Sequence, residues 1–315
     1  MKKTLAPVLL FVYARPNHTK KMIESLSKNK LAKESEVWIF SDNAKKDSAK
    51  ENVRQVREYI HSIENKGYFK KVHIIEAQKN KGLANSVIDG VTEIINELGK
   101  AIILEDDLVV TNNFLDYMNE ALDFYEKDER IWSISGYNFS MDIPEKYKHD
   151  IFLSYRGCSW GWATWKEQWN TVDWNVEDYN KFKNSYKKRK HFNKGGNDLS
   201  LMLDRQMRKE IDSWAIRWCY SQSKQNKYTI YPVNSLVCNI GLDGSGTHSG
   251  NIRDYDVTIN DTNTYKLENV EENKEILEIF KRKYNYGLKQ KIREIFSILN
   301  IYGIIKKYDK IKGNR

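Results

Sequence analysis

The sequence predicts an α/β fold in which a parallel sheet is covered by helices on both faces. Short apolar runs alternate with helical patterns from the N-terminus onward, and the runs are continuous, as in strands that are buried on both faces. Strands that are joined through helices in this way run parallel, with right-handed crossovers. The predicted strands are Pro7–Tyr13, Glu36–Ser41, Lys71–Glu76 and Ala101–Leu104.

A helix is expected after each strand because apolar residues recur there at helical spacing. Asn17, in the turn after the first strand, is a suitable N-cap for the first helix. The turn Asn80–Gly82 separates the third strand from its helix. The apolar faces consist of Met22, Ile23 and Leu26; Val53, Val56, Ile60 and Ile63; Val87, Val91, Ile94, Ile95 and Leu98; and Phe114, Met118, Leu122 and Tyr125.

The regular alternation ends after a further strand at Ile131–Ser135. Residues 133–220 are irregular and rich in aromatic side chains, and a last strand is expected at Tyr228–Pro232. Lys181–Lys194 contains seven basic residues with little apolar periodicity, which predicts a solvated or mobile loop. We therefore expect one domain over residues 1–255, with halves at 1–135 and 136–255, and then a linker and helices over 256–315.

The composition is that of an ordinary globular protein, because 40% of the 315 residues are hydrophobic and 30% are charged. No run approaches the roughly 18 apolar residues that span a bilayer, and the first apolar run does not resemble a signal peptide. The three cysteines, Cys158, Cys219 and Cys238, lack metal-ligand spacing. We expect free thiols and a cytoplasmic protein.

The net charge of +9 belongs to the C-terminal tail. From Lys281 onward there are eleven Lys or Arg residues against two acids, so residues 1–280 sum to zero. A helical apolar pattern opens with Ile276, Leu277, Ile279 and Phe280 and continues from Leu288 to Tyr308. It is flanked by these cations, and such a helix favours the surface of a membrane. A C-terminal helix docked on the body would show the same periodicity. Nucleic-acid binding is disfavoured, since the body adds no positive charge.

Three consecutive carboxylates, Glu105, Asp106 and Asp107, follow the fourth predicted strand. Their mutual repulsion and desolvation would be relieved by a divalent cation, and Mg²⁺ or Mn²⁺ could also bind diphosphate oxygens. The alternative is an acidic turn that caps the helix beginning near Asn112 or Asn113. Ligands of parallel sheets bind beyond the carboxyl ends of strands, which is where the triplet lies.

Arg15, Asp42 and Asn80 also follow predicted strand ends, so one edge of the sheet could gather them with the acidic triplet. No G-x-G-x-x-G follows the first strand and no G-x-x-x-x-G-K-[ST] occurs, which disfavours dinucleotide oxidoreductases and P-loop enzymes.

Two glycine-containing segments of the second half are further candidates for ligand contact. Trp160, Gly161 and Trp162 form a segment that could approach a ligand closely, with exposed aromatic faces suited to sugar rings. Trp165, Trp169 and Trp174 are expected in the core. Gly241–His248, with Gly250 just beyond it, places four glycines around a lone histidine, which suits either a phosphate or metal site or an ordinary glycine turn.

In this order, the motifs resemble those of bacterial glycosyltransferases of the GT-A fold, family-2-like. They are more distantly similar to those of the animal N-acetylglucosaminyltransferase that initiates complex N-glycans. The resemblance implies a Rossmann-like, mixed and mainly parallel sheet, with a nucleotide-sugar half over 1–135 and an acceptor half over 136–255. It rests on Pro7–Pro16, Asn80–Asn85, Glu105–Asp107, Gly161-Trp162, Asp212–Trp214 and Gly244–His248.

The resemblance also implies a role for individual residues. Asp107 would ligate Mn²⁺ or Mg²⁺, with His248 as a further metal or diphosphate ligand. Asp212, in an Asp-Ser-Trp motif, would be the catalytic base of an inverting enzyme. The residues implied in donor binding are Arg15, Asp42, Asn80, Gly82, Glu105 and Asp106, and those in acceptor binding are Trp160, Gly161 and Trp162.

Two departures from the family pattern leave alternatives open. The acidic motif begins with Glu105 instead of Asp, and Asp198, Asp204 and Glu210 compete with Asp212 as the base.

The implied function is transfer of a hexosyl or N-acetylhexosaminyl group from a nucleotide sugar, expected to be a UDP-sugar. The acceptor would be a glycan or lipid-linked glycan in lipopolysaccharide or capsule assembly, on the cytoplasmic face of the inner membrane if the tail binds lipid. The alternatives are a non-catalytic, membrane-associated saccharide-binding protein and a sugar nucleotidyltransferase. The latter usually has a glycine-rich basic loop after the first strand, and this sequence lacks one.

Overall fold

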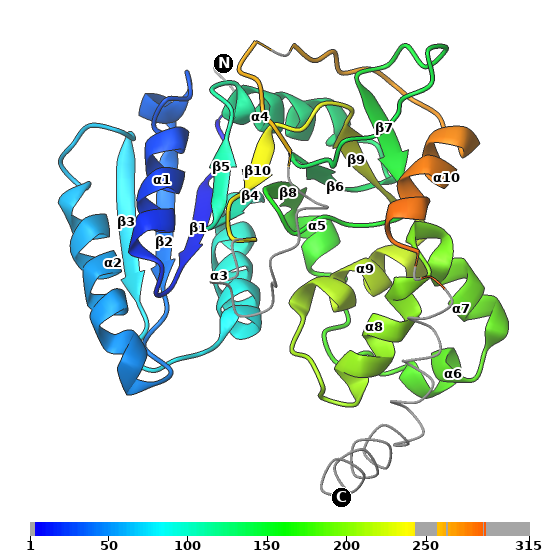
Figure 1. Cartoon of the computed structure of the whole chain (residues 1–315), viewed down its shortest axis with the longest axis horizontal. Coiled ribbons are helices and arrows are strands. Elements are labelled where there is room, and N and C mark those ends of the chain that lie inside the picture. The colour runs from blue at the N-terminus through cyan, green and yellow to red at the C-terminus, as the bar shows by residue number, and fades with distance from the viewer. Residues whose placement is uncertain (1–3, 243–256, 263, 286, 288–315) are drawn as a thin grey trace, which may run out of the picture.

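The computed structural model describes residues 4–242, 257–262, 264–285 and 287, and it shows a mixed α/β architecture (Figure 1). In this part of the chain, eight strands form one sheet in the order β3-β2-β1-β4-β8-β6-β9-β7. β8 and β7 run antiparallel to their neighbours, and the other strands share one direction. The predicted mixed, mainly parallel sheet is confirmed.

The strands of this sheet are β1 (Val8–Val12), β2 (Glu36–Ser41), β3 (Lys71–Glu76), β4 (Lys100–Glu105), β6 (Ile131–Ser135), β7 (Ile151–Ser154), β8 (Trp162–Trp165) and β9 (Tyr228–Pro232). A two-stranded sheet pairs β5 (Leu108–Val110) with β10 (Val237–Asn239). The helices are α1 (Pro16–Leu26), α2 (Lys50–Ser62), α3 (Leu83–Leu98), α4 (Phe114–Tyr125), α5 (Lys166–Trp169), α6 (Tyr179–Lys183), α7 (Tyr186–Phe192), α8 (Asp198–Met207), α9 (Trp214–Lys224) and α10 (Lys274–Lys283), with short 3₁₀ turns η1 (Ala32–Glu34), η2 (Asp47–Ala49) and η3 (Asn193–Gly195).

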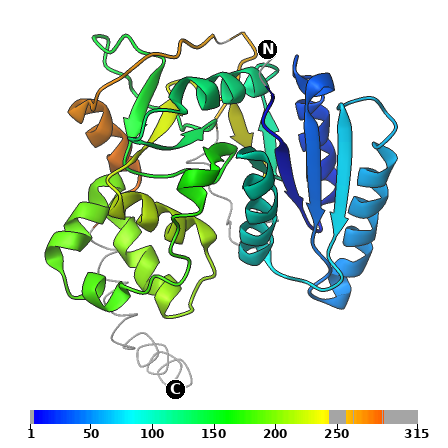
Figure 2. The same ribbon diagram turned by 180° about the vertical axis from the view of Figure 1, so that it is seen from behind.

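Helices cover both faces of the sheet, as β1 illustrates. Val8, Leu10 and Val12 belong to a core that includes α1, α2 and α4, whereas Leu9 and Phe11 belong to a second core with α3. Successive strand residues point to opposite faces, so a fully buried strand must be apolar at every position. α1 and α3 accordingly lie on opposite faces of the sheet (Figures 1 and 2).

The parallel strands of the first half end at one level. Phe11 of β1 pairs with Phe40 of β2 and with Glu105 of β4, so the turns that follow these strands emerge at the same edge. This edge carries the candidate site residues of the first half.

Residues 166–224 form a small helical lobe beside the sheet (Figure 1). The prediction of a loop over Lys181–Lys194 is wrong, because α6, α7 and η3 occupy most of this segment. Phe182 and Phe192 are buried in the lobe's own core with Leu203 and Tyr220, and this burial offsets the lack of a long apolar pattern.

The first part of the predicted C-terminal helical pattern is helix α10, which packs on the body. Ile276, Leu277 and Phe280 of α10 are buried, and the Phe280 ring packs against Phe139 and Phe152. The docked-helix alternative therefore holds for residues 274–283, while the basic face predicted from residue 288 onward lies outside the described residues. In the described ranges, no helix is long and apolar enough to cross a membrane.

Candidate active site

The acidic triplet lies where β4 ends, against the turn that follows β1. Asp107 Oδ2 accepts a hydrogen bond from Arg15 Nη1 at 2.9 Å, and both side chains are largely buried. Arg15 immediately precedes α1, whose first residue is Pro16. The helix-cap alternative is excluded, because β5 separates the triplet from α4 and Asn113 is the N-cap residue of that helix.

The three carboxyl groups crowd one another in a poorly solvated position. Burial, reinforced by the charges of Asp107 and Asp106, raises the pKa of Glu105 well above its usual range. Burial and the charge of Asp107 raise the pKa of Asp106 to about 7, although the Tyr13 amide donates to its Oδ2 at 3.0 Å. Burial also raises the pKa of Asp107, against the opposing effect of Arg15. One arginine therefore leaves the triplet short of positive charge.

A segment from the far end of the chain closes this region. β10 pairs with β5, and the Ile240 amide donates to the Asp107 carbonyl at 2.8 Å. Gly241 follows, and its carbonyl accepts from Arg15 Nη2 at 3.3 Å. A Cβ atom on Gly241 would overlap Asp107 Oδ2 and lie 2.7 Å from Arg15 Nη1, so only glycine fits here without displacing the pair.

Asp42, after β2, organises the turn that follows β3. Its Oδ1 accepts from the Asn43 and Lys81 amides at 2.8 and 2.9 Å, and its Oδ2 accepts from Asn80 Nδ2 and the Gly82 amide at 2.8 and 2.9 Å. A carboxylate oxygen has about two acceptor positions, so this side chain is fully engaged. Asp42 therefore positions the Asn80–Gly82 turn. The family resemblance had instead implied that Asp42 binds the nucleotide-sugar donor directly.

Tyr13 connects these two groups of residues. Its amide donates to Asp106, while its hydroxyl accepts from the Lys45 amide at 2.9 Å, in the same loop as Asp42. Arg15, Asp42, Asn80 and the acidic triplet therefore belong to one continuous edge of the sheet.

The residues of this edge fit a hard divalent cation such as Mg²⁺ or Mn²⁺. They offer carboxylate oxygens in excess of nearby positive charge, and such ions keep several positions for water and phosphate oxygens. Within the described ranges, no three His, Cys, Asp or Glu side chains converge as a preformed metal cage. His248, the predicted further ligand, lies outside those ranges.

Asp212 lies in the turn between α8 and α9 with 65% of its side chain exposed, and Arg217 Nη2 approaches its Oδ1 at 3.5 Å. The turn is held in place by the following helix, where Ser213 caps α9 and Trp214 is buried against Trp162 with ring centroids 5.1 Å apart. Asp212 is therefore an accessible carboxylate on a fixed support.

The competing acids are engaged elsewhere. Asp198 forms a two-point ion pair with Arg156, with both oxygens at 2.9 Å. Asp204 pairs in the same manner with Arg189 at 2.9 and 2.7 Å. Both acids are buried, so neither is open to an acceptor hydroxyl. Glu210 pairs with Arg208 and is partly exposed.

The predicted acceptor segment needs correction. Trp162 lies in β8 with no exposed surface, stacked among Trp169, Trp214 and Trp218, so it offers no ring face to a sugar. Gly161 is required for another reason: its φ is +66°, and an added Cβ would lie 2.8 Å from Val237 in the core. Trp160 is partly buried and packs edge-on against Tyr137.

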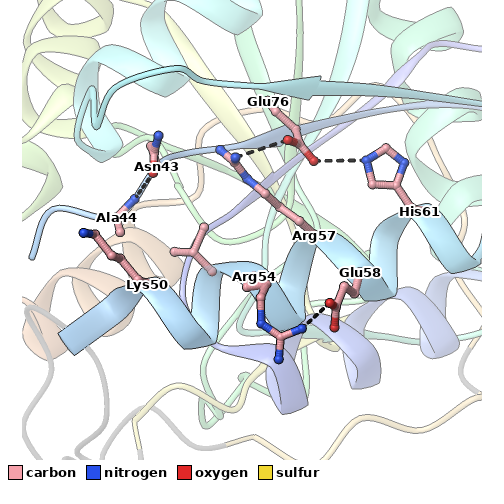
Figure 3. A pocket seen from close by; sticks show the side chains of 9 residues that line it. Asn43, Ala44, Lys50, Arg54, Arg57, Glu58, His61 and Glu76 are labelled. Atoms are coloured by element: carbon pink, nitrogen blue, oxygen red, sulfur yellow. Dashed lines mark hydrogen bonds and ion pairs between the residues drawn. The ribbon is translucent and has the colours of Figure 1, made fainter. Parts of the chain in front are cut away.

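A hollow of about 530 Å³ lies beside this edge, between α2 and the end of β3 (Figure 3). Its cations already have partners: Arg57 pairs with Glu76 at 3.1 Å, and Arg54 pairs with Glu58. It therefore shows no unbalanced charge that would select a ligand.

Sequence reasoning missed Tyr13 and Gly241 as parts of the site. Tyr13 contacts Asp106 through its backbone amide, and any residue except proline could donate this hydrogen bond, so the residue type does not reveal it. Gly241 opened the glycine segment that was noted, but its contact with Asp107 depends on the pairing of β10 with β5.

Comparison with known proteins yields no match to a family model or to a curated protein. Similar solved structures include S. aureus TarS 1–349 in complex with UDP-GlcNAc, at 13% identity and a TM-score of 0.31, covering 43% of this chain and 38% of that one. A second structure of S. aureus TarS 1–349 has 10% sequence identity and a TM-score of 0.39, and the match covers 72% of this chain and 60% of that one. A further structure of S. aureus TarS has 11% identity and a TM-score of 0.33, and the match covers 49% of this chain and 26% of that one. The chain thus spans less than two thirds of each TarS chain. Similarity at this level decides nothing about activity, which has to be argued from the site.

Proposed function

We propose that this chain is a metal-dependent glycosyltransferase that uses a nucleotide-sugar donor, with a UDP-sugar as the expected substrate. The observation that carries the proposal is the edge of the sheet where Glu105–Asp107 meet Arg15, beside the Asn80–Gly82 turn held by Asp42. An anionic donor with a bound cation supplies the positive charge that three crowded carboxylates lack.

In this proposal, Asp107 holds Mn²⁺ or Mg²⁺, with His248 as an additional ligand. When bound, the ion neutralises charge that develops on the departing nucleoside diphosphate. Arg15 orients the Asp107 carboxylate and adds a second positive charge next to the diphosphate. The Asn80–Gly82 turn supports the nucleoside. It is fixed because the Lys81 and Gly82 amides and the Asn80 side chain each donate to Asp42, and Asn80 Nδ2 also donates to the Asn43 carbonyl.

We assign Asp212 as the general base. Its side chain is 65% exposed, against 36% for Glu210, which pairs with Arg208, whereas Asp198 and Asp204 are buried in ion pairs with arginines. Asp212 would take the proton from an acceptor hydroxyl as this attacks the anomeric carbon opposite the leaving diphosphate, which inverts the anomeric centre. We propose a glycan or lipid-linked glycan as the acceptor, in surface polysaccharide assembly at the cytoplasmic face of the membrane.

The test is a screen of nucleotide sugars for hydrolysis with and without Mn²⁺. Asp107→Asn should abolish metal-dependent donor binding in a calorimetric titration. Asp212→Asn should retain donor binding but lose on the order of 10²–10⁴-fold in turnover to an acceptor. The matched control is Asp47→Asn, which removes a carboxylate that is 93% exposed and outside the site.

Each outcome separates the alternatives. Absence of Mn²⁺-dependent nucleotide-sugar binding in the wild type would favour a non-catalytic saccharide-binding protein and would overturn the proposal. Normal turnover by Asp212→Asn would refute only the assignment of the base.

A further inference from the structure

The helical lobe carries a concentration of positive charge that the proposed reaction does not use. Residues 179–194 include seven Lys or Arg residues and no acid. Because residues 1–280 sum to zero, the rest of that body carries seven net negative charges. Over the whole lobe, residues 166–224, thirteen Lys or Arg residues stand against eight acids, so the lobe has a net charge of +5 and the rest of residues 1–280 a net charge of −5.

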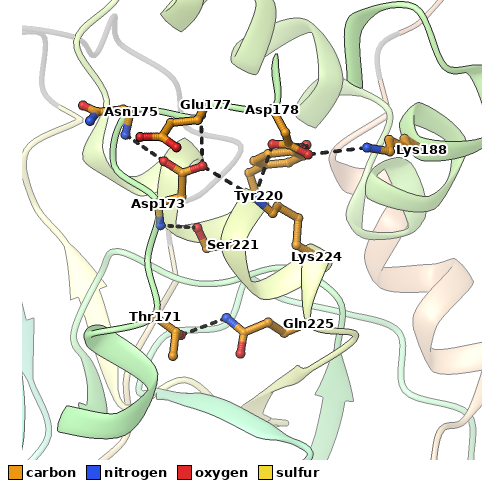
Figure 4. A network of polar contacts seen from close by, with 10 residues as sticks. All are labelled: Thr171, Asp173, Asn175, Glu177, Asp178, Lys188, Tyr220, Ser221, Lys224 and Gln225. Carbon is orange, nitrogen blue, oxygen red and sulfur yellow. Dashed lines mark hydrogen bonds and ion pairs between the residues drawn. The ribbon is translucent and has the colours of Figure 1, made fainter. Parts of the chain in front are cut away.

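Part of this charge is consumed inside the lobe. Lys188 approaches Asp178 at 3.5 Å, in a network with Tyr220 and Lys224 (Figure 4). Arg189 forms the two-point pair with Asp204. These contacts join α7 to the neighbouring segments, and they pair the two cations on the side of α7 that faces the lobe.

The outward side is different. Lys181 and Lys183 of α6 and Lys187 and Lys190 of α7 are exposed, and none has an acidic partner among the described residues. Tyr186 lies between the two pairs with 80% of its surface exposed, although it is a large aromatic residue. We call these five residues the basic face.

We propose that the basic face binds the surface of a bilayer that contains anionic lipids. Each lysine near such a surface contributes attraction that adds to that of its neighbours. A tyrosine projecting among lysines fits the headgroup region, where its ring is partly dehydrated and its hydroxyl remains hydrated. A nucleic acid would also satisfy the charges, but the rest of residues 1–280 adds no net positive charge to extend such a surface.

The course of the chain provides a separate argument. The Asn197 amide, at the start of α8, donates to Asn285 Oδ1 at 3.0 Å, so the end of α10 is attached to this same lobe. Residues 288–315 continue from that point with eight Lys or Arg residues and two acids. The strongly basic tail therefore begins at the lobe that carries the basic face.

The test is sedimentation of the full chain with vesicles of phosphatidylcholine containing 30% phosphatidylglycerol, and with vesicles of phosphatidylcholine alone. The variant Lys181→Gln/Lys183→Gln/Lys187→Gln/Lys190→Gln should lower the partition coefficient about 10- to 100-fold on the anionic vesicles. The control Lys21→Gln/Lys28→Gln/Lys30→Gln/Lys33→Gln removes the same charge on the α1 side, far from the lobe (Figures 1 and 2), and should have little effect. Tyr186→Ser should weaken binding by about threefold.

Three results would overturn the proposal. Equal loss in both quadruple variants would mean that net charge alone matters. Unchanged binding by the lobe variant would assign any membrane attraction to the tail. Tighter binding of a 30-nucleotide single-stranded RNA than of the anionic vesicles at the same ionic strength, lost in the lobe variant, would identify a nucleic-acid surface. The assay contains no donor sugar, so its result is independent of the proposed activity.

Discussion

Gly241 illustrates how one residue without a side chain defines the candidate site. The space that a methyl group would need is occupied by Asp107 Oδ2 and Arg15 Nη1. Gly241→Ala should therefore displace the ion pair and reduce metal-dependent donor hydrolysis by at least about tenfold, while the overall fold persists because Gly241 lies outside the helices and strands, just after β10. The measurement is Mn²⁺-dependent turnover beside a thermal melt. Gly67→Ala, at a turn with open space but a φ of +67°, adds backbone strain without a clash, so it is the control for a destabilising glycine substitution away from the site. Wild-type turnover in Gly241→Ala would show that the glycine approach is irrelevant to the site.

Asp106 predicts a stability effect with a definite pH dependence. Burial and the charge of Asp107 raise its pKa to about 7, from an ordinary value of about 3.9 for an aspartate. Below pH 4 the carboxyl group is protonated whether the chain is folded or unfolded, so the folded state has no penalty. As the pH rises, the unfolded chain loses the proton first, and stability is lost until the pH passes about 7.

Asp106→Asn removes this loss and keeps an acceptor for the Tyr13 amide. In metal-free protein it should raise the free energy of unfolding by about 1–3 kcal/mol at pH 8 and by almost nothing at pH 4. Urea titrations at the two pH values measure this difference. An equal effect at both values would mean that ionisation of Asp106 is not the cause.

At the level of elements, apolar runs were a reliable guide where a strand is buried on both faces. β6 and β9, which are almost wholly buried, have the predicted bounds. So do β2, which buries alternate residues, and the edge strand β3, which has no fully buried residue. β5, β7, β8 and β10 were not predicted. They are three or four residues long, and β8 begins at Trp162, which was interpreted as part of a ligand loop, and ends at Trp165, which was expected in the core.

The candidate site was predicted to a similar degree. Residues at strand ends were found because parallel strands direct their turns to one edge. The full engagement of Asp42 and the burial of Trp162 depend on contacts between distant segments, which no local pattern encodes.

α10 provides a prediction about an element. Phe280 is buried against Phe139, Phe152 and Tyr231, so Phe280→Ala should cost about 3–5 kcal/mol of unfolding free energy. Glu278→Ala changes an exposed position of the same helix and should stay within about 0.5 kcal/mol. Chemical denaturation followed by circular dichroism compares the two. Similar midpoints for both variants would mean that α10 does not contribute to the folded body.

At the level of the whole molecule, an aromatic cluster joins the first half of the sheet to the helical lobe. Trp162 contacts Trp169, Trp214 and Trp218, and α3 belongs to the same core. The cluster therefore fixes the turn that carries Asp212 relative to the edge that carries Asp107.

Trp162→Ala should cost about 3–5 kcal/mol and should also lower transferase turnover, because the Asp212 turn loses its support. Trp162→Phe keeps most of the apolar contact and should retain more of both properties. Urea unfolding and turnover are measured on the same preparations. Loss of stability without any loss of turnover would mean that the cluster supports the fold but not the site.

The pairing of β10 with β5 also constrains the order in which the molecule can become competent. Arg15 and Asp107 are made early, but the carbonyl that Arg15 contacts belongs to Gly241, 226 residues later in the chain. During synthesis, the sheet edge with Arg15 and the acidic triplet is therefore made before β10 and Gly241, which complete the site, have left the ribosome. If the proposed donor binds at this edge, a chain truncated before residue 237 should be unable to retain it.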